Sequence, residues 1–347
     1  MKKMIIAVAA LLTLAACSSP TMTVALDQEA SAQYAGIYAA VKQGYYQEAG
    51  LDVQIKYVDA GKGFDALQKG EANIIDEPLL NAVFRKGKDG LDLVNFLQTS
   101  QVSSLIVISQ QEISEFYNLQ GKKIGYVDNG NDLLVRALTA IKGMDIEWVK
   151  VADYHAFEDK TIDAYITPYY GDVFYLASVG EAPAYIYSLT RMGFDIPDDG
   201  LYTLRKTYNG NSEAFKKFAE ATVKGWAYCD SCKTDAVKLA MDEIGRRGIK
   251  GDYQHQNWIL TQVLKYQTDP IAKKKTYLLF EETEDAASSV LVRAKMIDKP
   301  VSVLPDRKSA PGSTGVSPQE MKAIADSLSP YVNDSTSKAA APSASKK

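Results

Sequence analysis

The sequence is poor in the residues that most metal, redox and hydrolytic sites need. It has two histidines, His155 and His255, neither within a recognisable motif, and only three cysteines. Two distant histidines and two candidate sulfur ligands give little support for a zinc site. No G-x-S-x-G nucleophile motif is present. The composition therefore argues against an enzyme, and we expect no catalytic residue and no metal.

Two of the cysteines, Cys229 and Cys232, are spaced C-x-x-C. A thioredoxin-like redox motif opens a helix after a strand, whereas this pair follows a helix-like run from 215 to 228. The pair is therefore interpreted as a small disulfide loop or as two free thiols at a helix end.

The chain also lacks a strong excess of charge of either sign. Its formal net charge is −4 over 347 residues, and the part expected to fold has no basic run. Phosphate binding needs clustered lysine and arginine, so nucleic acid is excluded as an expected partner. The length suits two lobes better than one core.

No apolar run is long enough to span a membrane, but the amino terminus is a secretory signal. A basic start at Lys2 and Lys3 precedes an apolar stretch from Met4 to Leu14, about half of the roughly 20 residues that a spanning helix needs. Leu14-Ala15-Ala16-Cys17 resembles the lipobox, in which the cysteine becomes the acylated amino terminus. We expect a signal peptide at 1–16, lipidation of Cys17 and a tether at 17–21. The alternative is an ordinary cleaved signal with an incidental cysteine.

The rest of the chain alternates between strand and helix patterns, which predicts an α/β fold with mostly parallel sheets. In the first half, strands are expected at 22–26, 53–57, 72–75 and 91–97, and helices at 33–49, 64–69 and 79–86. The second set has strands at 105–108, 123–127, 146–151, 162–167, 184–188 and 201–206, with helices at 132–141 and from Pro168. One long helical region is expected from Ser212 to Leu264, and 276–305 is left undecided.

The composition changes beyond Asp306 to serine, alanine, proline and lysine. Such a segment has too little apolar surface to fold, so a largely disordered tail is expected at 306–347. Gly61 to Ala66 matches the loose dinucleotide pattern G-x-G-x-x-A, but the helix after it is too short. We therefore expect no cofactor.

Three runs of sequence carry a resemblance to a known family. They are Val24-Ala25-Leu26-Asp27, Gln33-Tyr34-Ala35-Gly36-Ile37-Tyr38-Ala39-Ala40 and the stretch from Gly44 to Val53, GYYQEAGLDV. They resemble the opening of the thiamine-pyrimidine-precursor-type periplasmic binding proteins, which are related to the sulfonate-, taurine- and nitrate-binding proteins of ABC importers. Weaker matches extend the resemblance over about residues 22 to 265.

The resemblance implies a periplasmic binding protein type II fold, with two α/β lobes joined by two hinge crossovers. Lobe 1 is expected to comprise 22–105 and 201–305, and lobe 2 to comprise 106–200. The implied function is a monomeric, lipid-anchored receptor outside the cytoplasm, which closes on a small heteroaromatic ligand and delivers it to an ABC permease. Ser18 after the lipidated cysteine gives no strong retention signal, which favours the outer membrane.

Ligands of open α/β sheets bind where strands end, so candidate residues are those that follow a strand and face the expected cleft. Aromatic rings can stack on a flat heterocycle, and carboxylates can accept hydrogens from its amines. The candidates are Asp27, Gln28, Gln33, Tyr34, Asp76, Glu77, Asn129, Asn131, Tyr169, Tyr170 and Asp172.

Each candidate also has a plainer interpretation. Asp76 and Glu77 could cap the next helix, and the turn from Asn129 to Asn131 could instead offer N–H groups to an anion. Where the family's opening motif often has histidine, this chain has Tyr34, which argues against a pyrimidine-processing enzyme and leaves the ligand open. The remaining alternative is a lipoprotein of the same fold that contacts or senses another envelope component.

Overall fold

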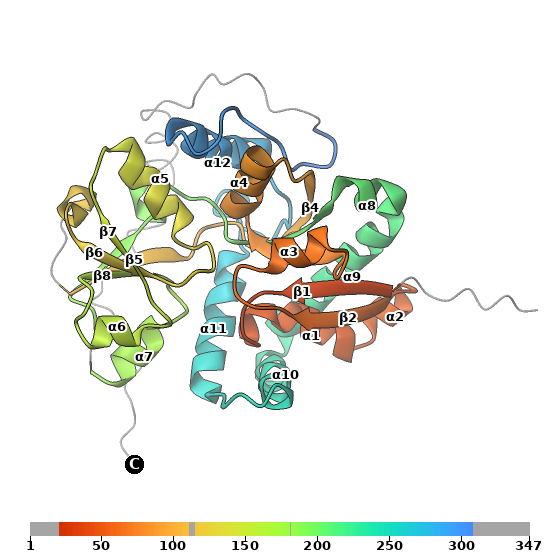
Figure 1. Ribbon diagram of the computed structural model, residues 1–347. Coiled ribbons are helices and arrows are strands. Elements are labelled where there is room, and N and C mark those ends of the chain that lie inside the picture. Colours follow the sequence, from red (N-terminus) through yellow and green to blue (C-terminus); the bar gives the residue numbers. More distant parts are fainter. Residues whose placement is uncertain (1–20, 111–114, 181, 308–347) are drawn as a thin grey trace, which may run out of the picture.

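The computed structural model describes residues 21–110, 115–180 and 182–307 (Figure 1). The predicted signal peptide at 1–16, the lipidation site Cys17, the tether up to residue 20 and the tail from residue 308 lie outside the described residues. Among the helices of the described part, none combines the length and apolar character needed to cross a bilayer.

Two five-stranded sheets form the framework of the molecule. The first has the order β2-β1-β3-β10-β4, with strands β1 (Thr21–Leu26), β2 (Asp52–Tyr57), β3 (Ile74–Pro78), β4 (Leu93–Gln98) and β10 (Asp199–Leu204). The second has the order β7-β6-β8-β5-β9, with strands β5 (Leu105–Ser109), β6 (Lys123–Tyr126), β7 (Glu147–Lys150), β8 (Ala164–Pro168) and β9 (Tyr185–Ser188). In each sheet one strand, β10 or β5, runs antiparallel to both of its neighbours.

These sheets confirm the predicted α/β fold with two lobes, which Figure 1 shows side by side. The expectation of mostly parallel sheets was wrong for the strand pairs, because all pairs made by β10 and β5 are antiparallel and both sheets are therefore mixed. We call the part built on the first sheet lobe 1 and the part built on the second sheet lobe 2. The chain passes from lobe 1 to lobe 2 through 99–104 and returns through 189–198. Because β10 is inserted between β3 and β4, lobe 1 contains strands from both sides of lobe 2 in the sequence.

The helices cover the faces of the two sheets. Those that follow the early strands are α1 (Ala35–Lys42), α2 (Tyr45–Glu48), α3 (Gly63–Gln68), α4 (Leu79–Asp89), α5 (Leu133–Ile141), α6 (His155–Glu158) and α7 (Val173–Ser178). The later helices are α8 (Arg205–Gly210), α9 (Ser212–Ser231), α10 (Lys233–Arg246), α11 (Tyr253–Tyr266) and α12 (Glu281–Arg293). Short 3-10 turns occur at Ala32–Tyr34, Phe116–Leu119 and Thr190–Met192.

Two predicted helices differ from those observed. The helix expected at 33–49 is divided at Gly44, which has a φ of +79°, a conformation that glycine adopts without strain. The helical region expected from Ser212 to Leu264 is confirmed and consists of α9, α10 and α11. Pro168 ends strand β8 instead of starting a helix, because it pairs with Leu105 of β5.

The segment 276–305, for which the sequence pattern predicted neither helix nor strand, contains helix α12. After this helix the chain runs along the edge of the first sheet. Val303 accepts a hydrogen bond at 2.7 Å from the Asn95 N–H of the edge strand β4. The buried Glu284 of α12 accepts hydrogen bonds from the N–H groups of Val303 and Leu304 and pairs with Arg307. Helix α12 packs against α4 of lobe 1 and α5 of lobe 2, so it connects the lobes (Figure 1).

Cys229 and Cys232 are free thiols. The structure therefore has two free thiols at a helix end and no disulfide loop between them. Cys229 belongs to α9 and is buried in the core of lobe 1, whereas Cys232 lies between α9 and α10. Burial raises the pKa of the Cys229 thiol to about 12, so it is protonated and poorly reactive at neutral pH.

Helices α1 and α9 pack unusually closely, and a glycine makes this possible. A Cβ atom added at Gly225 would lie 2.0 Å from the carbonyl oxygen of Gly36 and 2.9 Å from the backbone nitrogen of Ala40. The neighbouring Trp226 lies against Gly36 from the other helix. Backbone atoms cannot move aside as a flexible side chain can, so this contact fixes the distance between the two helices.

We predict that Gly225→Ala lowers the free energy of unfolding by roughly 2 to 3 kcal/mol, because it overpacks this contact. The matched control is Gly245→Ala in α10, where an added Cβ meets nothing within 4 Å. That substitution should be neutral or stabilise the protein by up to about 1 kcal/mol through helix propensity. Urea unfolding of both variants measures the difference, and equal stabilities would contradict the close packing.

Candidate functional site

The largest candidate site is a cavity of about 450 Å³ between the lobes. Lobe 1 contributes the loop from Gln28 to Ser31 and the first turn of α11, and lobe 2 contributes the residues that follow β6 and β8. Cavities of this size hold small organic ligands. The site therefore lies where the fold predicts it, at strand ends facing the partner lobe.

Six of the eleven candidate residues line this cavity. They are Gln28, Gln33, Asn129, Asn131, Tyr170 and Asp172. Asp27, Tyr34, Asp76, Glu77 and Tyr169 are not among the lining residues.

Asp172 is the carboxylate of the lobe 2 wall. Its Oδ2 accepts hydrogen bonds from the Tyr165 hydroxyl at 2.8 Å and the Thr167 hydroxyl at 3.3 Å. No described residue donates to Oδ1, and although Asp172 occupies the N-cap position of α7, its side chain makes no capping bond. Burial raises the pKa of Asp172, and the two hydroxyl bonds oppose that shift. An acceptor oxygen is therefore left for a bound molecule.

Two N–H groups of the loop from Asn129 to Asn131 already donate to acceptors within the loop region. The Asn129 N–H donates to the Val127 carbonyl at 2.8 Å, and the Asn131 N–H donates to the Asn129 side chain at 3.2 Å. Between them Gly130 touches lobe 1, since a Cβ there would lie 2.1 Å from Asn81 Nδ2. The loop is a turn at which the lobes meet.

A cluster of four carboxyl groups lies behind the lobe 1 wall and comprises Asp27, Asp76, Glu77 and Asp199. Gln33, which lines the cavity, donates from Nε2 to Asp199 Oδ1 at 2.9 Å, and Asp27 accepts the Gly61 N–H at 3.1 Å. Asp76 and Glu77 were expected to follow strand β3 but lie within it, because pairing with β10 extends the strand to Pro78. That pairing places Asp76 opposite Leu201 and Glu77 opposite Gly200.

Burial raises the pKa of every carboxyl group in this cluster. The pKa of Asp27 rises to about 6, against the effect of hydrogen bonds from Glu77 and Gly61. The pKa of Asp199 rises to about 7 through burial and the charge of Asp198. Burial, reinforced by neighbouring carboxylates, holds the pKa values of Asp76 and Glu77 well above their usual range. Protonation therefore neutralises much of the cluster.

The two remaining candidate tyrosines pack within the protein. Tyr34 is buried and meets the edge of Tyr38 with ring centres 6.4 Å apart. Tyr169 lies against Trp258 of α11 at 5.6 Å. Tyr34 begins a helix and Tyr169 directly follows β8, as predicted. The Tyr34 ring, however, lies in the core of lobe 1, and the Tyr169 ring packs against α11.

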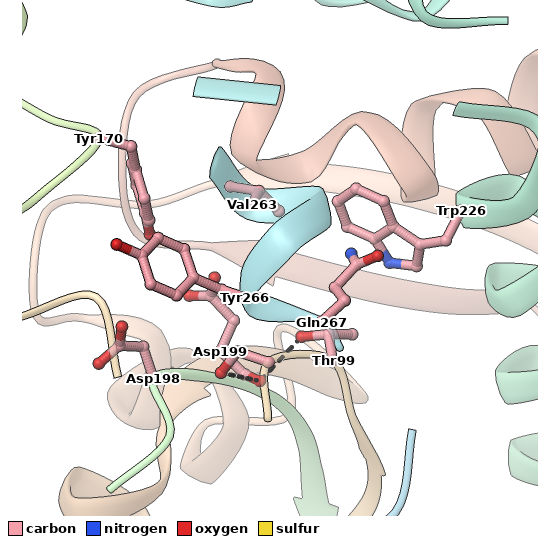
Figure 2. A pocket seen from close by; sticks show the side chains of 9 residues that line it. Thr99, Tyr170, Asp198, Asp199, Trp226, Val263, Tyr266 and Gln267 are labelled. Atoms are coloured by element: carbon pink, nitrogen blue, oxygen red, sulfur yellow. Dashed lines mark hydrogen bonds between the residues drawn. The ribbon is translucent and has the colours of Figure 1, made fainter. Parts of the chain in front are cut away.

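A second, much smaller cavity of about 10 Å³ lies beside the crossovers. Figure 2 shows Tyr170 and Tyr266 at one end of it, with Asp198 and Asp199 nearby and Trp226 and Gln267 at the other end. This volume holds about one water molecule. The cavity is therefore too small for a solute, and the larger one remains the candidate site.

Several residues that line the cavity could not be predicted from the sequence pattern. His255, Gln256 and Lys250 belong to α11 and the loop before it, and nothing in the local pattern relates them to the lobe 2 strands. Tyr175 could have been found, because it lies three residues after Asp172 at the start of a helix and shares its face.

The charge of the cavity wall is acidic on balance. Glu29, Asp153 and Asp172 line it together with a single lysine, Lys250. Within the described ranges, no group of three or more His, Cys, Asp or Glu side chains is arranged to hold a metal ion. The wall is suited to a ligand that donates hydrogen bonds or carries positive charge.

Comparison with known proteins gives a family and a fold. Residues 31–231 match the family described as NMT1/THI5 like. No curated protein matches the sequence. Among solved structures, a protein of Bordetella bronchiseptica RB50 is similar with a TM-score of 0.61 and 16% identity, covering 89% of this chain and 98% of its own.

Two further solved structures are similar to this chain over most of its length. The alkanesulfonate-binding protein SsuA of Xanthomonas axonopodis pv. citri, bound to MOPS, has a TM-score of 0.58 and 13% identity, covering 82% of this chain and 96% of its own. A Candida albicans gene product reported to have the generic periplasmic binding protein fold has a TM-score of 0.56 and 15% identity, covering 85% and 99%. At these identities the likeness concerns the fold alone.

The carboxyl cluster predicts how stability depends on pH. Aspartate in an unfolded chain has a pKa of about 3.9, whereas the pKa values of Asp27 and Asp199 are about 6 and 7. Above about pH 4 the folded protein keeps protons that the unfolded chain has lost, so the stability these groups contribute is lost as pH rises through 6 to 7.

We therefore expect a lower free energy of unfolding at pH 8 than at pH 5, and a smaller difference in Asp199→Asn. The amide of that variant can still accept the Gln33 bond. The exposed Asp59 provides the control, because Asp59→Asn should keep the wild-type difference. Urea unfolding at both pH values gives the comparison, and an unchanged difference in Asp199→Asn would contradict the assignment.

Proposed function

The chain belongs to the NMT1/THI5-like family, and we propose that it is a lipid-anchored, extracytoplasmic receptor for a small heteroaromatic solute. The receptor binds the solute between its lobes and delivers it to an ABC permease. The observation that carries this proposal is the cavity of about 450 Å³, which both lobes line. A crevice between hinged lobes can close around a ligand without any chemical step.

The proposed ligand is a thiamine pyrimidine precursor or a similar amine-bearing heterocycle. Tyr170 and Tyr175 supply aromatic surface to the cavity, and Asp172 Oδ1 is an acceptor for an amino group. The SsuA structure named above binds MOPS, a sulfonate. In this chain the single lysine and the three carboxylates of the wall favour a donor of hydrogen bonds over a sulfonate.

Calorimetry tests the ligand class directly. We expect 4-amino-5-hydroxymethyl-2-methylpyrimidine, the pyrimidine half of thiamine, to bind with a micromolar or lower Kd, which corresponds to about 8 kcal/mol. MOPS and taurine should bind far more weakly. Preference for the sulfonates, or no binding by any pyrimidine, would contradict the proposed ligand.

Asp172→Asn should weaken pyrimidine binding by roughly tenfold to a hundredfold, because a hydrogen bond to a charged group contributes about 1.5–3 kcal/mol. Asp145→Asn, an exposed position on the same lobe, is the matched control and should bind as the wild type does. Equal Kd values for the two variants would remove Asp172 from the site.

The anchor can be tested separately from the ligand. If Cys17 is acylated, the wild-type protein sediments with membranes and Cys17→Ser is released into the soluble extracytoplasmic fraction, because a chain without the lipid has lost its apolar anchor. Fractionation followed by immunoblotting measures both. A Cys17→Ser protein that stays in the membrane fraction would contradict lipidation at this residue.

A further inference from the structure

His255 belongs to lobe 1 by its position in α11, but its ring is surrounded by lobe 2. The ring stacks on Phe174 with centres 5.0 Å apart and meets Tyr175 edge-on at 4.3 Å. It is only 7% exposed. Figure 1 shows α11 running between the two lobes, with α7 facing its first turn.

The ring also makes hydrogen bonds across the boundary between the lobes. Its Nε2 lies 3.3 Å from the carbonyl oxygens of both Tyr170 and Gly171. Because both partners are acceptors, Nε2 must carry the proton in the neutral ring. Nδ1 is then unprotonated, and it is buried without a hydrogen-bond partner among the described residues. Burial lowers the pKa of His255, which keeps the ring neutral at pH 7.

The first turn of α11 holds this ring in a fixed place relative to lobe 1. The side chain of Asp252 accepts the His255 N–H at 2.9 Å and caps the helix. The side-chain oxygen Oε1 of the adjacent Gln256 accepts a buried hydrogen bond from the Ala32 N–H at 2.7 Å. Ala32 directly follows the loop from Gln28 to Ser31 that lines the cavity, so this hydrogen bond attaches the start of α11 to the loop.

On the lobe 2 side, His255 contacts residues that themselves form the cavity wall. Tyr170, Gly171 and Tyr175 all line the cavity, as His255 does. Separating the lobes would break the Nε2 bonds and expose two backbone carbonyls and the aromatic socket of Phe174 and Tyr175. Packing of a buried histidine within one domain would have no such consequence, because its partners would not belong to a different lobe.

We propose that His255 is the latch that holds the lobes together over a bound solute, and that it positions the Tyr170–Gly171 wall against the ligand. This inference rests on the proposed receptor function, since a latch matters only if the lobes open and close. A latch acts after the solute has entered, so it slows release and leaves entry nearly unchanged.

Two substitutions separate the hydrogen bonds from the packing. His255→Phe keeps an aromatic ring for stacking on Phe174 but has no donor for the two carbonyls. His255→Gln has an amide N–H that can take the place of Nε2–H. The matched control is His155→Phe, which changes the chain's other histidine on α6 of lobe 2, where the side chain is 60% exposed.

The experiment measures release and closure in the full-length chain with 4-amino-5-hydroxymethyl-2-methylpyrimidine as probe. Stopped-flow fluorescence gives the rate constants, and small-angle scattering with saturating probe gives the radius of gyration. For His255→Phe we expect release about tenfold faster, the loss that about 1.4 kcal/mol represents, with the association rate within about threefold of the wild type. Its radius of gyration should exceed that of the wild type.

His255→Gln should lie within about threefold of the wild type in release, and His155→Phe should match it in both measurements. If His255→Phe releases the probe at the wild-type rate and scatters as the wild type does, the latch is overturned and the receptor function stands. If His255→Gln is as impaired as His255→Phe, the packing rather than the donor matters, and the proposed hydrogen-bonded latch is wrong.

Failure of the proposed function gives a different result. In that case the wild-type protein does not bind the probe at all, and no rate can be measured. Scattering without the probe then still tests whether His255 holds the lobes together. Loss of the Nε2 bonds should give His255→Phe a larger radius of gyration than His155→Phe. Equal radii in that comparison would overturn the role of His255 independently of any ligand.

Discussion

The insertion of β10 between β3 and β4 is the constraint on which the rest of the structure depends. The chain must leave lobe 1 after β4, build lobe 2 and return antiparallel into the first sheet, between β3 and β4. This return places Asp199 at the start of an interior strand, next to the crossover and within reach of Gln33. It also extends β3 to Pro78 and thereby buries Asp76 and Glu77. The acidic cluster behind the cavity is a consequence of this topology.

The lobes are joined by more than the two crossovers. Helix α12 packs on α4 and α5 on one side of the molecule, and α11 reaches α7 through His255 on the cavity side. In the hinge motion that we propose, the apolar contact of α12 is the pivot and the polar contact of His255 is the one that opens. Apolar packing has no direction and tolerates small sliding, whereas a hydrogen bond between fixed groups is lost when the lobes separate by a few ångströms.

Much of the fold could be predicted from sequence, because burial on one side of an element leaves a local periodicity. The strands at 22–26 and 53–57 and the helix at 79–86 are observed with small shifts in their ends. Errors arose where local patterns do not determine the outcome. Gly44 in the left-handed conformation divides a continuous apolar pattern, and pairing with β5 makes Pro168 the end of a strand. Of the five candidates that follow a strand in lobe 2, Asn129, Asn131, Tyr170 and Asp172 line the cavity. Tyr169 packs against Trp258 instead, and Tyr34 of lobe 1 lies in the core.

The sequence by itself determined the α/β class, the order of most elements and the candidates that follow the lobe 2 strands, because each of these depends on neighbours a few residues apart. The tertiary structure alone decided which carboxyl groups are buried together, that α12 connects the lobes, and that His255 faces Tyr170, 85 residues away in the chain. Contacts between such distant residues depend on how whole lobes pack, and that packing leaves no periodicity in the local sequence.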